Sequence, residues 1–394
     1  MLLSAPAEIE RVLTNSHDFV KHYALRFLQP ILGRGLVTSE GELWRRQRRL
    51  IQPEFARQRI AAYAEPVVRH ALELAERWRP GTTTRLHADM GRLAMKIAAE
   101  AFLNVRLEAE VGPVARAIDV FTRDFDRRLR SALPPPVWLP TPRNLQLLVH
   151  VRRLGRILQR AIEERQRGRG LGEDVLSRLV RIQAAEGRDA LPDRQIRDEV
   201  VTLFLAGHET TAVALTWTWC LLARHPAVLE RMLAEQDAVL GGRPPEAADL
   251  PRLPYTERIV LESLRLYPPA FVIGREALRD CEIGGYRVPA GTAVLMSAWV
   301  VHRDGRFFEE PERFEPDRWE GLQPGSLARC PWFPFGGGSR SCIGSAFARM
   351  EIALVLATLA PRWRIEPVDG ELPAPWPAVT LRPSRDPEAR LELR

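Results

Sequence analysis

The 394-residue chain has few cysteines, and this scarcity excludes two classes of protein. Its four cysteines form no CxxC pair, so neither a disulfide framework nor a zinc ribbon is expected. The composition instead fits a reducing, cytoplasmic location. Lysine is scarcer still, because Lys21 and Lys96 are the two lysines among 57 basic residues. The arginines are interleaved with 50 acidic residues, so the net charge of +7 does not indicate nucleic-acid binding.

Signals for export and for membrane insertion are also lacking. The opening residues, MLLSAPAEIERV, have no charged region followed by an apolar stretch, as a secretory signal would. The most lipid-like segment, Val200–Ala223, has His208 and Glu209 at its centre, where a charged group is costly in lipid. We therefore expect a long buried helix with a functional polar centre, and no transmembrane segment.

Domain boundaries are missing as well. No Gly/Ser linker divides the chain and no period of 20–50 residues recurs, so we expect one large domain over residues 1–394. Apolar residues at three- and four-residue spacing predict helices through most of the chain. The predicted helices are Pro6–Thr14, Glu42–Gln52, Arg59–Arg79, Asn144–Arg169, Asp193–His225, Ala227–Leu240 and Tyr255–Leu266.

Strand signals are confined to the second half of the chain. They predict strands at Ala270–Ile273, Cys281–Val288 and Thr292–Ser297, with a hairpin turn at Gly284-Gly285. Prolines cluster from Pro251 to Pro334, which predicts an ordered segment rich in coil. The expected fold class is mainly α with small β-sheets.

The stretch FPFGGGSRSCIGSAFARM, ending at Met350, contains the most informative cysteine. Cys342 precedes an apolar helix, and a helix N-terminus lowers the pKa of a thiol and favours the thiolate. Three glycines before it allow close approach to a flat ligand, Phe335 can shield the sulfur, and Arg340 offers a cation. This set suits an axial ligand to haem iron. We interpret Cys220 and Cys281 as buried structural cysteines.

The fixed positions of this loop resemble a known signature. Phe335, Gly338, Arg340, Cys342 and Gly344 match the FxxGxRxCxG pattern of the cytochrome P450 superfamily. The resemblance implies the P450 fold (α+β), haem b as cofactor and a cofactor-binding role for the loop. It also implies that the thiolate of residue 342 ligates the iron and that residue 340 pairs with a haem propionate.

The polar centre of the long predicted helix reads Ala206-Gly207-His208-Glu209-Thr210. A threonine can bond to the carbonyl four residues earlier, and Ala206 with Gly207 leaves room there for a small molecule. The segment is similar to the family's (A/G)Gx(D/E)T motif, which implies that Thr210 lies beside bound oxygen and that Glu209 supplies protons. The alternative is that Thr210 caps a bend and Glu209 is solvated. We interpret His208 as a buried or cleft histidine.

Glu262 and Arg265 stand three residues apart on a predicted helix and resemble the family's ExxR pair. Its third member is an arginine of the proline-rich segment. The letters PERF favour Arg313, but the longer pattern PxxFxPxR(F/W) favours Arg318, which we predict. These residues have a structural role. The tripeptide starting at His302 echoes a kinase HRD motif without its companions, and we discard that echo.

Trp44 and Arg48 are four residues apart, so they share a helical face and offer donors suited to a carboxylate. They resemble the family's WxxxR propionate anchor, and Arg275 resembles its second propionate arginine. A surface position is the alternative for each arginine. Three further arginines around this helix, at positions 45, 46 and 49, form either a basic docking face for an acidic ferredoxin or flavodoxin, or a solvated helix face.

The resemblance extends from about Pro6 to Val379, and its start is the exception. Family members have an earlier first helix and two sheet strands, so the N-terminal strands and first helix are expected to be missing here. A sheet edge is then left unpaired.

The function implied by the resemblance is a monooxygenase that hydroxylates an unactivated C–H bond with O₂. Electrons are expected from a separate ferredoxin or flavodoxin with its reductase, and the substrate is expected to be a lipid, terpenoid or carotenoid because the candidate pocket is apolar. The candidate lining is Phe27, Leu28, Phe121, Phe125, Trp138, Leu139, Phe204, Phe271, Val272 and Trp376. Two alternatives are a peroxide-driven peroxygenase, which typically lacks the acid–alcohol pair, and a haem-thiolate gas sensor, which usually carries a signalling module.

Overall fold

The computed structural model describes residues 1–105, 139–322, 331–368 and 370–394, with scattered positions between 116 and 136. The side chains of residues 30, 31 and 154 are also outside the description. Three residues that the sequence singled out fall outside it too: Phe121, Phe125 and Trp138. The described chain forms two compact units, and the single domain over residues 1–394 stays a prediction.

The first unit comprises Met1–His22, Arg57–Leu93 and Thr210–Arg394, and the second comprises Tyr23–Ala56 and Ala94–Glu209. Two helices contribute to both units, α6 (Leu86–Leu103) and the 32-residue α10 (Asp193–Arg224). The other helical segments of the second unit are η1 (Tyr23–Leu28), α2 (Gln29–Leu32), α3 (Gly41–Ile51), η2 (Gln52–Phe55), α8 (Pro142–Gln166) and α9 (Val175–Glu186).

The first unit combines helices with all the strands of the described chain. Its longer helices are α1 (Pro6–Thr14), α4 (Arg57–Ala62), α5 (Ala64–Arg77), α11 (Pro226–Leu240), α12 (Pro254–Leu266) and α14 (Ser345–Leu359). Short helical turns are η3 (Ala247–Arg252), α13 (Ala298–Val301), η4 (Pro316–Trp319) and η5 (Gly338–Arg340). The predicted fold class, mainly α with small sheets, is confirmed.

The largest sheet has the strand order β1-β7-β4-β2 (Leu2–Leu3, Ala293–Ser297, Val272–Ala277 and Phe19–Lys21). β1 runs parallel to β7, whereas β7 and β2 each run antiparallel to β4. A three-stranded sheet has the order β3-β11-β8 (Thr83–Arg85, Glu388–Leu393, Trp363–Pro367). Two hairpin-like pairs complete the set, β5 with β6 (Cys281–Ile283, Tyr286–Val288) and β9 with β10 (Pro375–Pro377, Leu381–Pro383).

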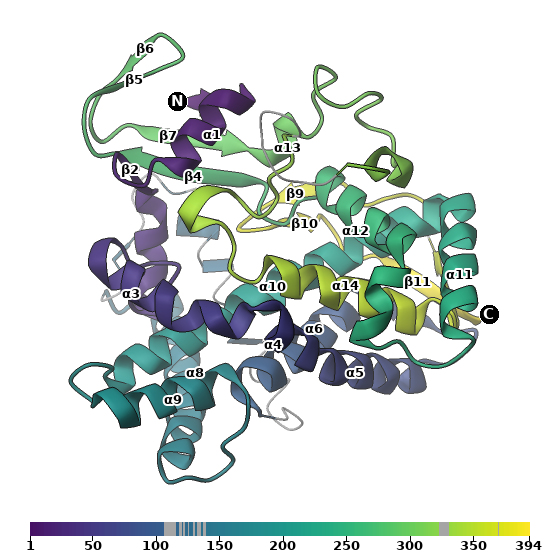
Figure 1. Cartoon of the computed structure of the whole chain (residues 1–394), viewed down its shortest axis with the longest axis horizontal. Helices are drawn as coiled ribbons and strands as arrows, with labels where there is room; N and C mark the ends of the chain where they lie inside the picture. The colour runs from purple at the N-terminus through teal and green to yellow at the C-terminus, as the bar shows by residue number, and fades with distance from the viewer. Residues whose placement is uncertain are drawn as a thin grey trace. The chain divides into compact units, whose positions relative to one another are not determined.

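Helix α1 lies against the largest sheet, as the purple and light-green ribbons of Figure 1 show. Its buried residues Ile9, Val12 and Leu13 pack in one apolar cluster with strand residues such as Met296 and with Phe333. Because Phe333 begins the cysteine loop, the same apolar core that holds α1 on the sheet also anchors that loop.

The chain before α1 contributes a strand that the sequence did not predict. Leu2 pairs with Leu295, and Leu3 pairs with Met296, so β1 covers the edge of β7. The expectation that the N-terminal strands are missing and leave a sheet edge unpaired is wrong for this edge. At the opposite edge of this sheet, β2 pairs with β4.

Most predicted helices match the observed ones within three residues, but the helix predicted at Arg59–Arg79 is two helices. The chain breaks at Tyr63 between α4 and α5. Pro66 explains the break, because in a continuous helix its ring would clash with the carbonyl of residue 62. Within the described residues, no helix is both long and apolar enough to cross a membrane.

Candidate active site around Cys342

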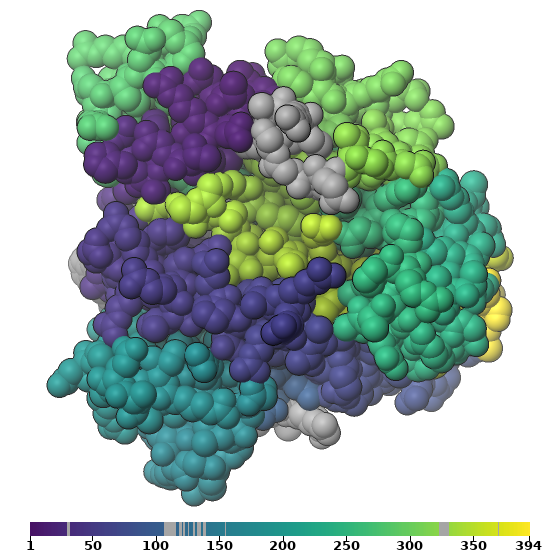
Figure 2. Space-filling model, in the orientation of Figure 1, coloured from purple at the N-terminus to yellow at the C-terminus, as the bar shows by residue number. Residues whose placement is uncertain are grey.

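The cysteine loop, residues 333–344, is held by its own backbone. The N–H of Gly336 donates to the carbonyl of Phe333 at 2.9 Å, and the N–H of Cys342 donates to the carbonyl of Phe335 at 2.8 Å. α14 begins three residues after the cysteine, at Ser345, with Gly344 as its N-cap. Cys342 is exposed although Phe333 and the first buried residue of α14 are in the core. Figure 2 shows this yellow-green segment reaching the surface beside purple α1.

The glycines of the loop have a packing role. Gly336 and Gly338 have φ angles of +72° and +66°, a conformation that favours glycine. A Cβ atom at Gly338 would overlap the backbone carbonyl of Leu13, and one at Gly337 would lie 3.2 Å from the Leu13 Cδ1 atom. The glycines therefore let the loop lie directly on the end of α1, whereas the sequence suggested room for a flat ligand.

The described cysteines differ in chemistry. Cys220 is buried in α10, and burial raises the pKa of its thiol to about 12, so it stays protonated. Cys281 is half-buried rather than buried as predicted, and burial also raises the pKa of its thiol. Cys342 is the exposed one. No group of three His, Cys, Asp or Glu residues in the described chain is arranged to hold a metal ion.

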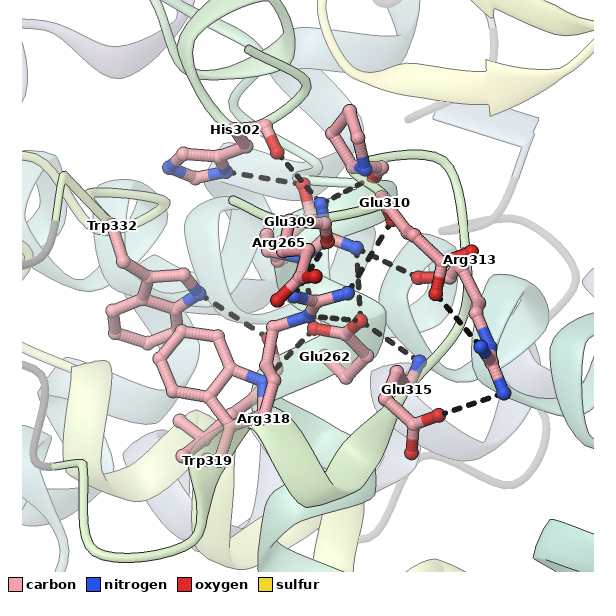
Figure 3. A network of polar contacts seen from close by, with 12 residues as sticks. Glu262, Arg265, His302, Glu309, Glu310, Arg313, Glu315, Arg318, Trp319 and Trp332 are labelled. Carbon is pink, nitrogen blue, oxygen red and sulfur yellow. Dashed lines mark hydrogen bonds and ion pairs between the residues drawn. The ribbon is translucent and has the colours of Figure 1, made fainter. Parts of the chain in front are cut away.

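The Glu262–Arg265 pair is completely buried on α12, with 0% exposure of both side chains. Arg265 binds both carboxylate oxygens of Glu262 at 2.8 Å. Its remaining N–H groups donate to the carbonyls of His302, Pro311 and Arg313 at 2.6–3.0 Å. All five guanidinium donors are therefore used, which is the condition under which a buried ion pair is stable. Figure 3 shows these contacts.

Two further side chains bind Glu262 from the segment around η4. Arg318 Nε donates to Glu262 Oε1 at 3.0 Å, and Trp319 Nε1 donates to Oε2 at 2.9 Å. Arg313 contributes its carbonyl, while its side chain pairs at the surface with Glu310 and Glu315. The structure thus places Arg318, not the side chain of Arg313, in this network.

His302 was missed as a functional candidate because its tripeptide echoed an unrelated motif. It is fully buried, accepts the N–H of Phe333 at Nε2 (3.0 Å) and donates from Nδ1 to the carbonyl of Arg265 (3.1 Å). Burial lowers its pKa to about 3, so the ring is neutral and this tautomer is fixed. His302 therefore connects α12 to the first residue of the cysteine loop.

Two tryptophans make a second connection that the sequence did not reveal. Trp319 contacts Trp332 edge-on at 5.6 Å, and Trp332 contacts Phe335 edge-on at 5.9 Å. Trp332 Nε1 also donates to the Leu261 carbonyl at 3.2 Å. The side chain of Phe335 is thus positioned from the α12 network, while its carbonyl holds the N–H of Cys342.

The middle of α10 is less buried than the stretches on either side of it, residues 198–204 and 211–222. Ala206 is exposed, and Gly207, Glu209 and Thr210 are half-buried. Gly207 does not leave open space, because a Cβ atom there would lie 2.9 Å from Phe102 Cε2 of α6. The space that the sequence predicted at Gly207 is therefore filled by the ring of Phe102. His208 is buried and stacks on Phe204.

A buried acid that the sequence did not single out lies on α14 beside the next threonine of α10. Thr211 Oγ1 donates to Glu351 Oε2 at 3.3 Å, while Glu351 Oε1 is buried without a partner in the described structure. Burial raises the pKa of Glu351 well above its ordinary value. No sequence pattern distinguished it from the other acids on helices.

The predicted propionate anchors lie on different elements. Trp44 is buried on α3, and Arg48 Nε donates to Gln52 Oε1 at 3.3 Å. Arg275 is buried on β4, where its Nη1 donates to the Gly274 carbonyl at 3.1 Å. Arg340 ends η5 and is half-buried. Their contacts with a cofactor stay predictions.

The predicted basic docking face on α3 is partly neutralised. Arg45 pairs with Glu42, and Arg46 pairs with Glu186 at 3.2 Å. Arg49 is exposed. The ion pairs reduce the field that this helix presents to an acidic partner.

We expect Arg318→Met to destabilise the protein by about 1–3 kcal/mol, because buried Glu262 loses a donor. Arg313→Met is the matched control, since it removes exposed ion pairs worth about 0–1 kcal/mol and keeps the carbonyl that Arg265 uses. Denaturant unfolding measures both variants. Equal losses in the two would contradict the assignment of Arg318.

The pH dependence of the stability of the Glu351→Gln variant tests whether the pKa of Glu351 is raised in the native state. The pKa of Glu351 is raised in the native state, so above about pH 4.5 the unfolded chain releases a proton that the native chain retains. The stabilisation of the native state by protonated Glu351 is therefore complete below about pH 4.5 and is lost as the pH rises. We expect the melting temperature of Glu351→Gln to exceed that of the wild type by an amount that grows from about pH 5 to about pH 8. The exposed Glu366→Gln is the control, and an unchanging gap for Glu351→Gln would refute the argument.

Comparison with known proteins agrees with this geometry. The family model described as cytochrome P450 matches residues 1–386. Cyclooctatin synthase of Streptomyces melanosporofaciens is 38% identical over 383 residues, 95% of this chain and 83% of that protein. Cyclooctat-9-en-7-ol 5-monooxygenase of the same organism is 38% identical over 366 residues, 93% of this chain and 80% of that protein. Pentalenene oxygenase of Streptomyces avermitilis is 36% identical, over 91% of this chain and 80% of that protein.

The match covers nearly the whole chain and includes the cysteine loop, α10 and the Glu262–Arg265 network. The chain therefore belongs to the cytochrome P450 family, and it is a haem-dependent monooxygenase, an oxidoreductase that uses O₂ and electrons from a redox partner.

Proposed function

We propose that this chain hydroxylates an unactivated C–H bond of a terpenoid, with haem b held by the thiolate of Cys342. The exposure of Cys342 in a loop that is otherwise anchored in the core carries the proposal. The terpenoid class rests on relatives whose names denote oxygenation of such compounds, pentalenene among them.

The bound haem supplies the oxygen activation that a thiolate ligand promotes. The chain's contribution begins with Cys342, whose sulfur is presented at the surface by the backbone bond to Phe335. Arg340 on the same loop and Arg275 on β4 are proposed to hold the haem propionates, because a guanidinium binds a carboxylate through paired hydrogen bonds. Trp44 and Arg48 are proposed as the further propionate anchor.

Proton handling is assigned to the centre of α10. We assign Glu209 as the acid and Thr210 as the hydroxyl that passes the proton on, since both are half-buried next to exposed Ala206. Buried Glu351 and Thr211 support this stretch of helix from the side of α14.

An apolar lining supports the choice of substrate class. Among the described candidates, Val272 and Trp376 are 39% and 49% exposed, so large apolar surfaces are available for a ligand. Phe204 and Leu28 are buried and belong to the core as much as to a pocket. The redox partner is proposed to be a ferredoxin or a flavodoxin with its reductase.

Replacing the sulfur tests the assigned ligand. We expect Cys342→Ser, reconstituted with haem, to lose the red-shifted Soret band that thiolate ligation gives the reduced carbon monoxide complex. Cys281→Ser is the control, because that thiol is half-buried on a strand and should leave the band intact. Survival of the band in Cys342→Ser would assign the iron to another residue.

The Thr210→Ala variant tests two assignments, the role of the Thr210 hydroxyl in proton transfer and the use of O₂ with electrons instead of hydrogen peroxide. With pentalenene as the probe substrate and a ferredoxin and its reductase as electron source, we expect at least tenfold less product per electron and more hydrogen peroxide, because the hydroxyl contributes to proton transfer. Thr210→Ser should restore coupling. Unchanged coupling in Thr210→Ala would reject the assignment, and equal wild-type turnover with hydrogen peroxide alone would favour a peroxygenase.

A further inference from the structure

Trp217 connects the long helix α10 to the hairpin of β9 and β10. Its side chain has 0% exposure, so its indole N–H needs a partner inside the protein. Nε1 donates to the Leu381 carbonyl of β10 at 2.7 Å, and the N–H of Leu381 donates to the Pro269 carbonyl at 3.0 Å. Both backbone polar groups of Leu381 therefore bind outside the hairpin, which is yellow in Figure 1.

The hairpin has few backbone groups with which to hold itself together. Three of its six strand residues are prolines, which offer no N–H to the pairing of the strands. Because Leu381 donates elsewhere, Trp376 and Arg382 are the strand residues whose N–H groups are left for that pairing. A two-stranded hairpin on its own is marginally stable in water. Its position therefore depends on contacts outside the hairpin, and the two bonds at Leu381 are such contacts.

The indole of Trp217 is held in one orientation by an aromatic stack. It lies nearly parallel to the ring of Tyr267, with 4.0 Å between the ring centroids and 15° between the planes. Tyr267, which follows α12, meets Trp299 of α13 at 5.8 Å, and the Arg303 guanidinium lies 3.3 Å from the centroid of Trp299. Packing from α12 and α13 therefore directs Nε1 at Leu381. A donor fixed in this way also fixes the place of its acceptor.

The bonds at Leu381 reach both segments that carry described candidates for the pocket lining. Trp376 lies on β9, the strand that pairs with β10, and its side chain is exposed. On the other side, Pro269 precedes Phe271 and Val272 by two and three residues, and Val272 is exposed as well. Leu381 thus ties these two segments to each other, and Trp217 ties them to α10.

We propose that Trp217 is a positioning residue for substrate specificity. Its N–H holds Leu381, and the hairpin held there presents Trp376 to the substrate. Trp217 follows Thr210 by roughly 10 Å along α10, so this role is separate from proton handling. The inference rests on the proposed function in one respect, the assignment of Trp376 to the substrate pocket.

The Trp217→Phe variant removes the N–H and keeps an aromatic ring beside Tyr267. Trp219→Phe is the matched control, because Trp219 lies on the same helix at 2% exposure and its Nε1 is buried without a partner in the described structure. The same atoms are deleted from two buried indoles, and the bond to Leu381 is lost in Trp217→Phe alone. Both variants are compared as haem-loaded full chains that retain the wild-type Soret band.

Amide hydrogen exchange without substrate tests the anchor. We expect residues 374–384 to exchange about tenfold faster in Trp217→Phe, because loss of one buried hydrogen bond raises the population of the opened hairpin by about that factor. Trp219→Phe should exchange like the wild type. Unchanged exchange in Trp217→Phe would overturn the proposal.

Binding of 1-dodecylimidazole tests the consequence for the pocket. Its imidazole nitrogen binds the haem iron and its chain occupies an apolar pocket, whereas imidazole lacks the chain. We expect Trp217→Phe to weaken binding of 1-dodecylimidazole about threefold to tenfold, the cost of ordering one large side chain on binding, and to leave imidazole binding unchanged. Trp376→Ala should weaken it too, and adding Trp217→Phe to Trp376→Ala should weaken it no further.

Three results would contradict this role. An equal loss for imidazole would mean that Trp217→Phe disturbs the haem site as a whole. No loss in Trp376→Ala would remove Trp376 from the pocket, and a full further loss in the double variant would mean that Trp217 acts by another route. Each of these overturns the proposal. Neither measurement requires turnover or a terpenoid, so a failure of the proposed hydroxylation is a separate result.

Discussion

The buried ion pair between Glu262 and Arg265 is the contact on which the cysteine loop depends. Two charges at 0% exposure are costly to desolvate, and the cost is offset here because every guanidinium N–H has an acceptor. Three of those acceptors are backbone carbonyls between His302 and Arg313, so the pair organises a segment that has little regular structure of its own. A coil-rich segment is thereby given a single conformation.

From that network two connections reach the cysteine loop. One runs through neutral His302 to the N–H of Phe333, and the other runs through Trp319 and Trp332 to the ring of Phe335. On the opposite side the glycines let the loop contact Leu13 of α1. Position and orientation of Cys342 therefore follow from packing at both ends of its loop, which is what a ligand on a rigid scaffold requires.

The segment that leads into α8 is also held by buried polar side chains. There the buried side chains of Asn144 and Arg128 bind the backbone carbonyls of Pro135, Pro136 and Leu139. In both places a buried arginine binds the backbone of a proline-rich segment, three carbonyls in the case of Arg265 and the Pro135 carbonyl in the case of Arg128. Proline offers a carbonyl but no N–H, so such a segment cannot organise itself through regular hydrogen bonds. The same kind of contact therefore orders the segment around Pro311 in one unit and the segment leading into α8 in the other.

What the sequence determined by itself was local. The cysteine loop and the ExxR pair are short motifs that could be recognised from their residue types and spacing, and helix periodicity located α1, α10 and α12 to within a few residues. The roles of Glu209 and Thr210 stay predictions. The pattern PxxFxPxR(F/W) also selected Arg318 rather than Arg313 as the side chain that binds Glu262, and the structure confirms this choice. Only tertiary structure decided which groups meet across long separations: Gly338 against Leu13, Gly207 against Phe102, and Glu351 beside Thr211. These contacts depend on how elements pack, and no spacing within one segment encodes the burial that makes His302 neutral.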